Sequence, residues 1–178
     1  LIITGNMGYK PNIDATLYFY KNVFPLILDK KPQTKLKIVG GNPDNKIKNL
    51  NVNSNVEVTG YVEDIRNYLK QAMVSICTVK LNIGVQTKIL ESMAMGTPVV
   101  STTSGNIGIE AIDKQDIIIE DNPTILANKI IQLLDGKGWN KQSVNGRKYV
   151  EKNFKWSISM KELDSLIKFN YNFKLKTR

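Results

Sequence analysis

The feature that most constrains the fold is an alternation along the chain between short apolar runs and segments with helical periodicity. Six apolar runs are short enough to be buried strands, at residues 1–4, 35–39, 56–59, 73–79, 98–101 and 116–119. Continuous apolar runs of this length, separated by helices, are typical of a parallel sheet that is covered on both faces. We therefore predict a three-layer α/β/α domain with a six-stranded parallel sheet.

The helical segments between and after these strands complete the predicted domain. Apolar residues recur at helical spacing over 13–27, with Asn12 as the predicted N-cap and Pro32 beyond the end. Further helices are predicted at 63–72, 86–95, 123–134, 140–153 and 157–169, and the tail 170–178 is basic and weakly patterned. No repeat or linker interrupts this order, so we expect one domain over 1–178 whose C-terminal helices span about 123–170.

Length and composition suit one soluble domain. The 178 residues are 42% hydrophobic, which is enough for a single core. The chain has no run of about 18 apolar residues and no recognisable leader, so we expect a cytoplasmic location. Because it opens directly in a strand at Leu1, we expect it to be part of a longer protein.

The residue inventory excludes two classes of catalytic site. The chain has no histidine, so neither a Ser-His-Asp triad nor a histidine-based zinc site can form. The one cysteine, Cys77, lies within an apolar run and has no partner for an intramolecular disulfide. We interpret Cys77 as a buried structural thiol.

The strong basic charge predicts an anionic partner. The net charge is +9 and the pI is near 9.5. Phosphate, nucleic acid and an acidic membrane surface would all satisfy that charge, and charge alone does not choose among them. No stretch interleaves lysines with aromatic residues as a single-strand binding platform does, so we expect no nucleic-acid partner.

The loop after the first strand suits a phosphate. In open parallel sheets, ligands bind at the carboxyl ends of the strands. Here Gly5 and Gly8 allow a close backbone approach, and Lys10 brings a cation near a helix N-terminus. Glycines after a strand also serve as ordinary turn residues, so both interpretations stay open. The loop lacks the G-x-G-x-x-G spacing and the chain has no P-loop, which disfavours NAD and Walker-type ATP binding.

A second candidate anion site precedes the helix at 86–95. Backbone N–H groups of residues 82–86, at the positive end of the helix dipole, suit a diphosphate. The helix is expected to pack through Ile89, Leu90, Met93 and Ala94, which leaves Glu91 on the other face with Thr87, Lys88 and Met95. There Glu91 could accept hydrogen bonds from the vicinal hydroxyls of a ribose, or it could form an ordinary ion pair with Lys88.

Residues 84–100 (GVQTKILESMAMGTPVV) resemble the core motif of family 4 glycosyltransferases, L-E-A-M-A-x-G-x-P-V-V. Residues 5–12, 38–40, 58–62, 145–148 and 154–156 support the likeness in the family's order, over nearly the whole chain. The resemblance implies a GT-B enzyme built from two Rossmann-like domains. This chain would be the C-terminal, donor-binding domain, without the N-terminal acceptor domain, and would bind its donor weakly and transfer nothing alone.

The resemblance also implies roles for particular residues. Glu91 would bind the ribose, Lys10 would face the diphosphate, and the backbone at Tyr61 and Val62 would border the base. The family retains the anomeric configuration and uses no bound metal or other cofactor, because positive charge and backbone amides stabilise the leaving diphosphate. The expected catalytic residues are Lys10 and Glu91, and the expected donor-binding residues are Gly5, Asn6, Gly8, Tyr61, Val62, Gly84, Val85, Gln86, Lys88 and Glu91.

Two positions depart from the family pattern. Ile83 stands where members carry a glutamate eight residues before Glu91, and Asn6 stands where an arginine is common. We therefore expect recognition of the nucleotide to be more secure than recognition of the sugar, with Gln86 or Lys88 taking over part of the missing role. The loop 103–110 resembles the family's glycine-rich loop at the cleft, although it could equally be a surface loop with a solvated Glu110.

These observations lead to one main functional hypothesis and two alternatives. The main hypothesis is transfer from a UDP-, GDP- or ADP-linked sugar to a saccharide or lipid-linked acceptor of a surface polysaccharide or glycolipid. The basic surface would suit docking at the anionic inner face of the cell membrane. The alternatives are a binding-only domain without turnover and a Rossmann enzyme such as a nucleotide-sugar epimerase, which the absence of a Tyr-x-x-x-Lys pair disfavours.

Overall fold

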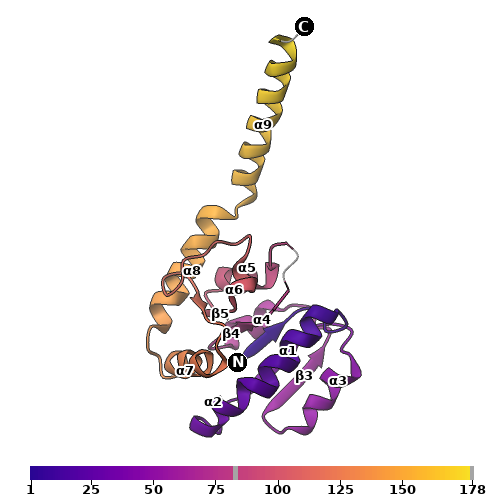
Figure 1. Ribbon diagram of the computed structural model, residues 1–178, viewed down its shortest axis with the longest axis vertical. Coiled ribbons are helices and arrows are strands. Elements are labelled where there is room, and N and C mark those ends of the chain that lie inside the picture. The colour runs from indigo at the N-terminus through magenta and orange to yellow at the C-terminus, as the bar shows by residue number, and fades with distance from the viewer. Residues whose placement is uncertain (82–83, 177–178) are drawn as a thin grey trace.

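The computed structural model describes residues 1–81 and 84–176 and has one parallel sheet at its centre (Figure 1). The six strands follow the order β3-β2-β1-β4-β5-β6, and all neighbouring pairs are parallel. This confirms the predicted sheet. Its strands are β1 (Ile2–Thr4), β2 (Leu36–Val39), β3 (Val56–Gly60), β4 (Ser75–Cys77), β5 (Val99–Ser101) and β6 (Ile118–Ile119).

The direction in which the sheet grows reverses between β1 and β4. From β1 the chain continues to β2 and β3 on one side, and then returns to place β4 on the other side of β1. The loops that leave β1 and β4 therefore diverge at the carboxyl end of the sheet, which is the topological switch point at which open α/β sheets bind ligands.

Helices cover both faces of the sheet. Ile3 packs in a core cluster with Phe19, Phe24 and Ile130, whereas its neighbour Ile2 packs with Leu69 in another. Successive strand residues point to opposite faces, so these two clusters fill the two sides. The helices are α1 (Lys10–Asn22), α2 (Phe24–Lys30), α3 (Asn45–Lys48), the 3₁₀ helix η1 (Asn49–Val52), α4 (Arg66–Gln71), α5 (Thr87–Ala94), α6 (Thr103–Asn106), α7 (Pro123–Leu134), α8 (Trp139–Asn153) and α9 (Trp156–Lys176).

The first helical segment differs from its prediction in two ways. Asn12 is not the N-cap, because Tyr9 holds that position and α1 begins at Lys10. The segment is also two helices rather than one, with the break at Val23, which is both the C-cap of α1 and the N-cap of α2. Pro25 lies in the first turn of α2, where a missing N–H costs nothing, but it could not continue α1.

Other helices match their predictions with smaller corrections. On α5, Ser92 is buried and Ala94 is exposed, contrary to the expected packing face. Ser92 can be buried because its hydroxyl donates to Lys88 O at 2.7 Å and lies 2.8 Å from Ser75 Oγ. The loop 103–110 begins with α6, which the Thr102 hydroxyl caps. The last helix runs past the predicted end at 169, as far as Lys176.

No helix in the described part of the chain has the length and apolar character needed to cross a membrane. Cys77 is buried in β4, as predicted. Burial raises the pKa of its thiol, and the nearby Lys88 ammonium opposes that rise. The thiol is therefore protonated and structural.

Candidate functional site

Glycine packing holds the loops after β1 and β2 tightly together at the switch point. Gly5 and Gly40 have φ of 143° and 151°, and a Cβ on Gly40 would lie 1.7 Å from the carbonyl oxygen of Gly5. A Cβ on Gly8 would lie 2.8 Å from Asn42 O. No side chain fits between these backbones, so the two loops can pack this closely only with glycine at positions 8 and 40.

Asn6 stabilises this loop internally. Its side-chain oxygen accepts a hydrogen bond from Gly8 N at 3.0 Å, and its carbonyl oxygen accepts one from Asn12 Nδ2 at 3.0 Å. The residue that stands at the family's arginine position therefore shapes the loop and brings no cation to it.

Lys88 supplies a cation at the same place from α5. Its ammonium donates to Asn12 Oδ1 at 2.5 Å and would lie 3.2 Å from a Cβ on Gly5. The side chain is half-buried, and burial lowers its pKa, with Cys77 and Glu91 opposing that change. The sequence left open an ordinary ion pair between Lys88 and Glu91. Among the described residues no such ion pair forms, so the Glu91 carboxylate is available to a ligand.

Glu91 lies in the wall of a pocket of about 490 Å³. The pocket opens between α5 and the segment that follows β3, so Glu91 faces residues that come directly after Tyr61 and Val62. Tyr61 is 79% exposed, whereas Val62 packs into the core against Leu69. The pocket is lined by Glu63, Asp64, Ile65, Arg66, Leu69, Glu91, Ala94 and Met95.

One ion pair shapes the rim of this pocket. Both carboxylate oxygens of Asp64 accept hydrogen bonds from the Arg66 guanidinium at 2.9 Å, and Asp64 also accepts from Arg66 N. These bonds lower the pKa of Asp64. The sequence interpretation missed Glu63, Asp64 and Arg66, although the rule that ligands bind after parallel strands would have selected them because they follow β3.

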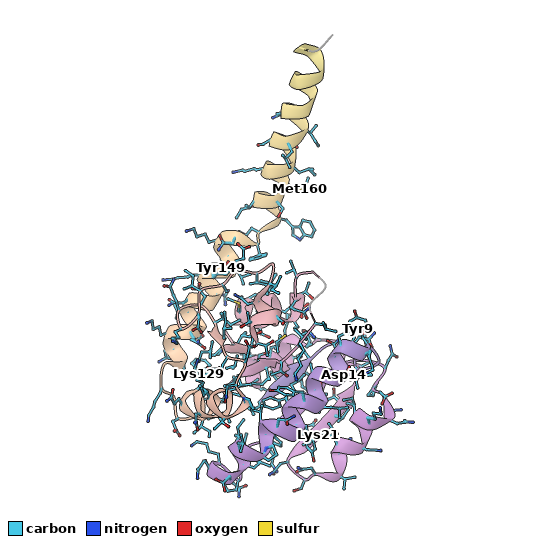
Figure 2. All side chains as sticks on the ribbon, in the orientation of Figure 1. Tyr9, Asp14, Lys21, Lys129, Tyr149 and Met160 are labelled. Carbon is cyan, nitrogen blue, oxygen red and sulfur yellow. The ribbon has the colours of Figure 1, made fainter. Side chains whose placement is uncertain are left out.

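Lys10 lies apart from this group. It pairs with Asp14 at 2.6 Å, its side chain is 75% exposed, and it lines a different pocket of about 370 Å³. In Figure 2, Tyr9 and Asp14 mark the end of α1 at which Lys10 lies, and Lys21 marks the other end. In this pocket Lys80 stands over the ring of Tyr18, 4.1 Å from its centroid. Lys10 therefore lines a different pocket from Glu91, and its ammonium pairs with Asp14.

The segment before α5 is described only in part. Gly84 and Val85 are exposed, Gln86 is the N-cap of α5, and Asn82 and Ile83 lie outside the described residues. A Cβ on Gly108 would lie 3.3 Å from Val85 Cγ2, so the loop 103–110 packs beside this segment. The exposed Glu110 of that loop has a positive φ of 60°. Within 1–81 and 84–176, no group of His, Cys, Asp and Glu could hold a metal ion.

The model of the family described as glycosyl transferases, group 1, matches residues 1–136. The chain belongs to this family. Its resemblance to the C-terminal domain of GT-B glycosyltransferases is thereby confirmed, together with the Rossmann-like three-layer fold. No curated protein sequence matches this glycosyl transferase chain.

Solved structures share the fold of this glycosyl transferase at low sequence identity. A TarM mutant from S. aureus, in complex with Fondaparinux, alpha-GlcNAc-glycerol and UDP, matches 92% of the chain with a TM-score of 0.72 and 21% identity. The pneumococcal O-GlcNAc transferase GtfA, in complex with UDP and GlcNAc, matches 94% with a TM-score of 0.72 and 16% identity. The chain covers 34% of TarM and 35% of GtfA, about a third of each.

One similar structure has nearly the same extent as this chain. It is the C-terminal domain of LpcC, a group 1 family glycosyl transferase from Francisella tularensis, with a TM-score of 0.70 and 17% identity. The match covers 87% of this chain and 86% of that domain. The described fold is therefore that of one domain of a glycosyl transferase.

Proposed function

We propose that this chain binds a nucleotide-diphosphate sugar, and that its parent enzyme transfers the sugar to a saccharide or lipid-linked acceptor. The observation that carries this proposal is the position of Glu91, in the wall of a pocket beside the switch point and one helical turn from Lys88. A carboxylate and a cation spaced in this way suit the ribose and the diphosphate of one nucleotide. UDP in the solved TarM and GtfA complexes supports the same ligand class.

The proposal places the ribose and the base of the nucleotide in the pocket beside Glu91. Glu91 is exposed and has no ion-pair partner among the described residues, so its oxygens can accept hydrogen bonds from the two vicinal ribose hydroxyls. The base would then lie toward Glu63 and Ile65, with the backbone of Tyr61 and Val62 along its edge.

The diphosphate would lie between Lys88 and the loop from Gly5 to Gly8. Lys88 takes the place of the arginine that Asn6 replaces, since its ammonium already stands against Gly5. The backbone of Gly84 and Val85 and the N-terminus of α5 would add N–H donors. Gln86 at the helix start completes this set, and Lys10 would reach the diphosphate only by leaving Asp14.

The chemistry that this donor-binding domain would supply is stabilisation of the leaving nucleoside diphosphate. Bond cleavage at the anomeric carbon transfers negative charge onto the nucleoside diphosphate, and the Lys88 ammonium with backbone N–H groups would stabilise that charge. This device uses no cofactor, no metal and no protein nucleophile, and the family resemblance implies retention of configuration. We expect the product of this transfer to be a surface polysaccharide or a glycolipid. The transfer would take place in the cytoplasm, at the inner face of the cell membrane.

Calorimetric titration with UDP, GDP and ADP tests this proposal. We expect at least one of them to bind, with weak affinity because the chain is one half of a cleft, and Glu91→Ala to weaken that binding by about tenfold. A chain that binds none of the three at millimolar concentration would not be a donor-binding domain.

The second candidate is a domain that binds nucleotide sugars without turnover. Asn6 and Ile83, at positions where the family carries an arginine and a glutamate, are the observations that favour it. The parent protein with both halves should hydrolyse or transfer the donor sugar if the first proposal holds. Tight donor binding without any release of nucleoside diphosphate would favour the second.

A further inference from the structure

The pocket beside Glu91 has an acidic wall in a strongly basic chain. Three carboxylates line it, those of Glu63, Asp64 and Glu91. Arg66 adds one guanidinium, so three negative charges and one positive charge give the lining residues a net charge of −2, whereas the whole chain carries +9. Such a wall repels phosphate and attracts groups that donate hydrogen bonds. The part of a nucleotide that it suits is the ribose with its base, and not the diphosphate.

The ion pair in this wall leaves the Glu63 carboxylate free. Both carboxylate oxygens of Asp64 accept hydrogen bonds from Arg66, through Nε and Nη2, at 2.9 Å. Glu63 is exposed and forms no ion pair with any residue within 1–81 and 84–176. Glu91 is unpaired among the same residues. Two carboxylates with open acceptor positions therefore share one pocket.

The apolar part of the wall suits the flat face of a base. Ile65 and Leu69 line the pocket from the segment after β3, and Ala94 and Met95 line it from the end of α5. The pocket volume of about 490 Å³ lies within the range of small-molecule sites. With the ribose at Glu91, a base that packs on this apolar wall presents its polar edge to the remaining free carboxylate, that of Glu63.

Bases differ in what they can donate to a carboxylate. An ionised carboxylate only accepts hydrogen bonds. Guanine presents N1–H and the N2 amino group side by side, so the two oxygens of one carboxylate can accept from both together. Uracil presents N3–H alone, between two carbonyl oxygens that a carboxylate repels. Adenine presents its N6 amino group beside N1, which is itself an acceptor. Of these three bases, guanine therefore matches a free carboxylate best.

We propose that Glu63 binds the edge of the base and selects guanine, which makes the donor a GDP-linked sugar. This inference rests on the proposed function, because Glu91 must hold the ribose for the base to reach Glu63. The UDP in the TarM and GtfA complexes does not decide the base here, since identities of 21% and 16% support a shared fold only.

Calorimetric titration of the chain with GDP, IDP, UDP and ADP tests the selection of guanine. IDP differs from GDP only in lacking the N2 amino group, so it isolates one of the two hydrogen bonds to Glu63. We expect GDP to bind about tenfold more tightly than IDP, because a hydrogen bond to an ionised carboxylate is lost. The preference for GDP over UDP and ADP should be at least as large.

A variant of Glu63 tests whether this residue causes the preference. Glu63→Ala changes an exposed side chain, so the domain should stay folded. It should weaken GDP binding by about tenfold or more and make the affinities for GDP and IDP equal. Glu57→Ala is the matched control, because it removes an exposed carboxylate of β3 that does not line the pocket. It should leave the preference for GDP over IDP unchanged.

The possible failures of this inference and of the donor site can be told apart. Tighter binding of UDP or ADP than of GDP would overturn the selection of guanine and leave the donor site standing. If Glu63→Ala kept the preference for GDP over IDP, or if Glu57→Ala lost it equally, Glu63 would not be the residue that selects the base. A chain that binds none of the four at millimolar concentration would overturn the donor site and this inference together.

Discussion

Among single residues, Asn6, Asn12 and Lys88 together shape the candidate site, and Asn12 has a different part in it from the one that the sequence predicted. Asn6 stands where a cation is common but accepts a hydrogen bond from the loop backbone, and Lys88 of α5 brings its ammonium to the same point. Asn12, predicted to cap a helix, instead accepts the hydrogen bond that holds Lys88 there. These contacts join residues far apart in the sequence, which periodicity and capping rules do not detect.

Removing the Lys88 ammonium should weaken nucleotide binding. We expect Lys88→Ala to lower the affinity for nucleoside diphosphates by about tenfold or more, because a hydrogen bond to a charged group is lost. The affinity for the unphosphorylated nucleoside should change little. Lys80→Ala, which removes an exposed lysine that contacts Tyr18, serves as the control in the same titrations. A similar loss with both variants would contradict a specific role for Lys88.

The pH dependence of binding should follow the same group. Burial lowers the pKa of Lys88 below its ordinary value of 10.5, so the free protein loses this positive charge at a lower pH than an exposed lysine would. Affinity for a nucleoside diphosphate should therefore fall as the pH rises through the lowered pKa. Lys88→Met should remove this dependence, as calorimetry at a series of alkaline pH values would measure.

Protein stability should change with pH in the opposite direction. Between the lowered pKa of folded Lys88 and its unfolded value of 10.5, the unfolded chain holds one more proton at this site than the folded chain does. The contribution of Lys88 to the free energy of unfolding thus rises with pH in that window. If urea titrations of the wild type and Lys88→Met showed the same pH dependence there, Lys88 would not be the responsible group.

Among helices and strands, the sequence predicted the strands of the sheet correctly, but not the break between α1 and α2 or the pocket between α5 and the segment after β3. Buried parallel strands appear in the sequence as short apolar runs, and all six predicted runs contain the observed strands or overlap them. Pro25 explains the break between α1 and α2. The break was not predicted because apolar residues keep a helical spacing across it, over residues 13–27. The pocket that holds Glu91 joins residues after β3 to α5, and only the order of the strands brings them together.

The contact between the loops after β1 and β2 should be intolerant of any side chain. Gly40→Ala would place a Cβ 1.7 Å from Gly5 O, so we expect the free energy of unfolding to fall by more than about 3 kcal/mol. Gly136→Ala is the matched control, since its φ of 79° is also positive but no atom lies within 4 Å of the new Cβ. It should cost about 1–2 kcal/mol. Equal costs in urea unfolding would mean that backbone conformation, and not the contact, explains the glycine.

Considered as a whole molecule, the chain is a Rossmann-like fold in which α8 packs against α5 and only α9 projects from the rest (Figure 1). The total charge of +9 was visible in the sequence, and residues 137–178 carry +8 of it, but only the structure shows that the lysines of α8 are exposed. The segment after 169 looked weakly patterned, whereas the structure continues α9 to Lys176. The chain spans about a third of TarM and of GtfA, and we propose that the rest of its parent enzyme supplies the acceptor site.

The role of Glu91 is tested by comparing the binding of ribonucleotides and deoxyribonucleotides to the wild type and to Glu91→Ala. The nucleoside diphosphate that binds best among UDP, GDP and ADP is titrated by calorimetry alongside its 2′-deoxy counterpart, into the wild type and Glu91→Ala. If Glu91 binds the ribose hydroxyls, the wild type should prefer the ribonucleotide by about tenfold, and Glu91→Ala should bind both forms equally and weakly. An equal preference in wild type and variant would show that Glu91 does not bind the ribose hydroxyls.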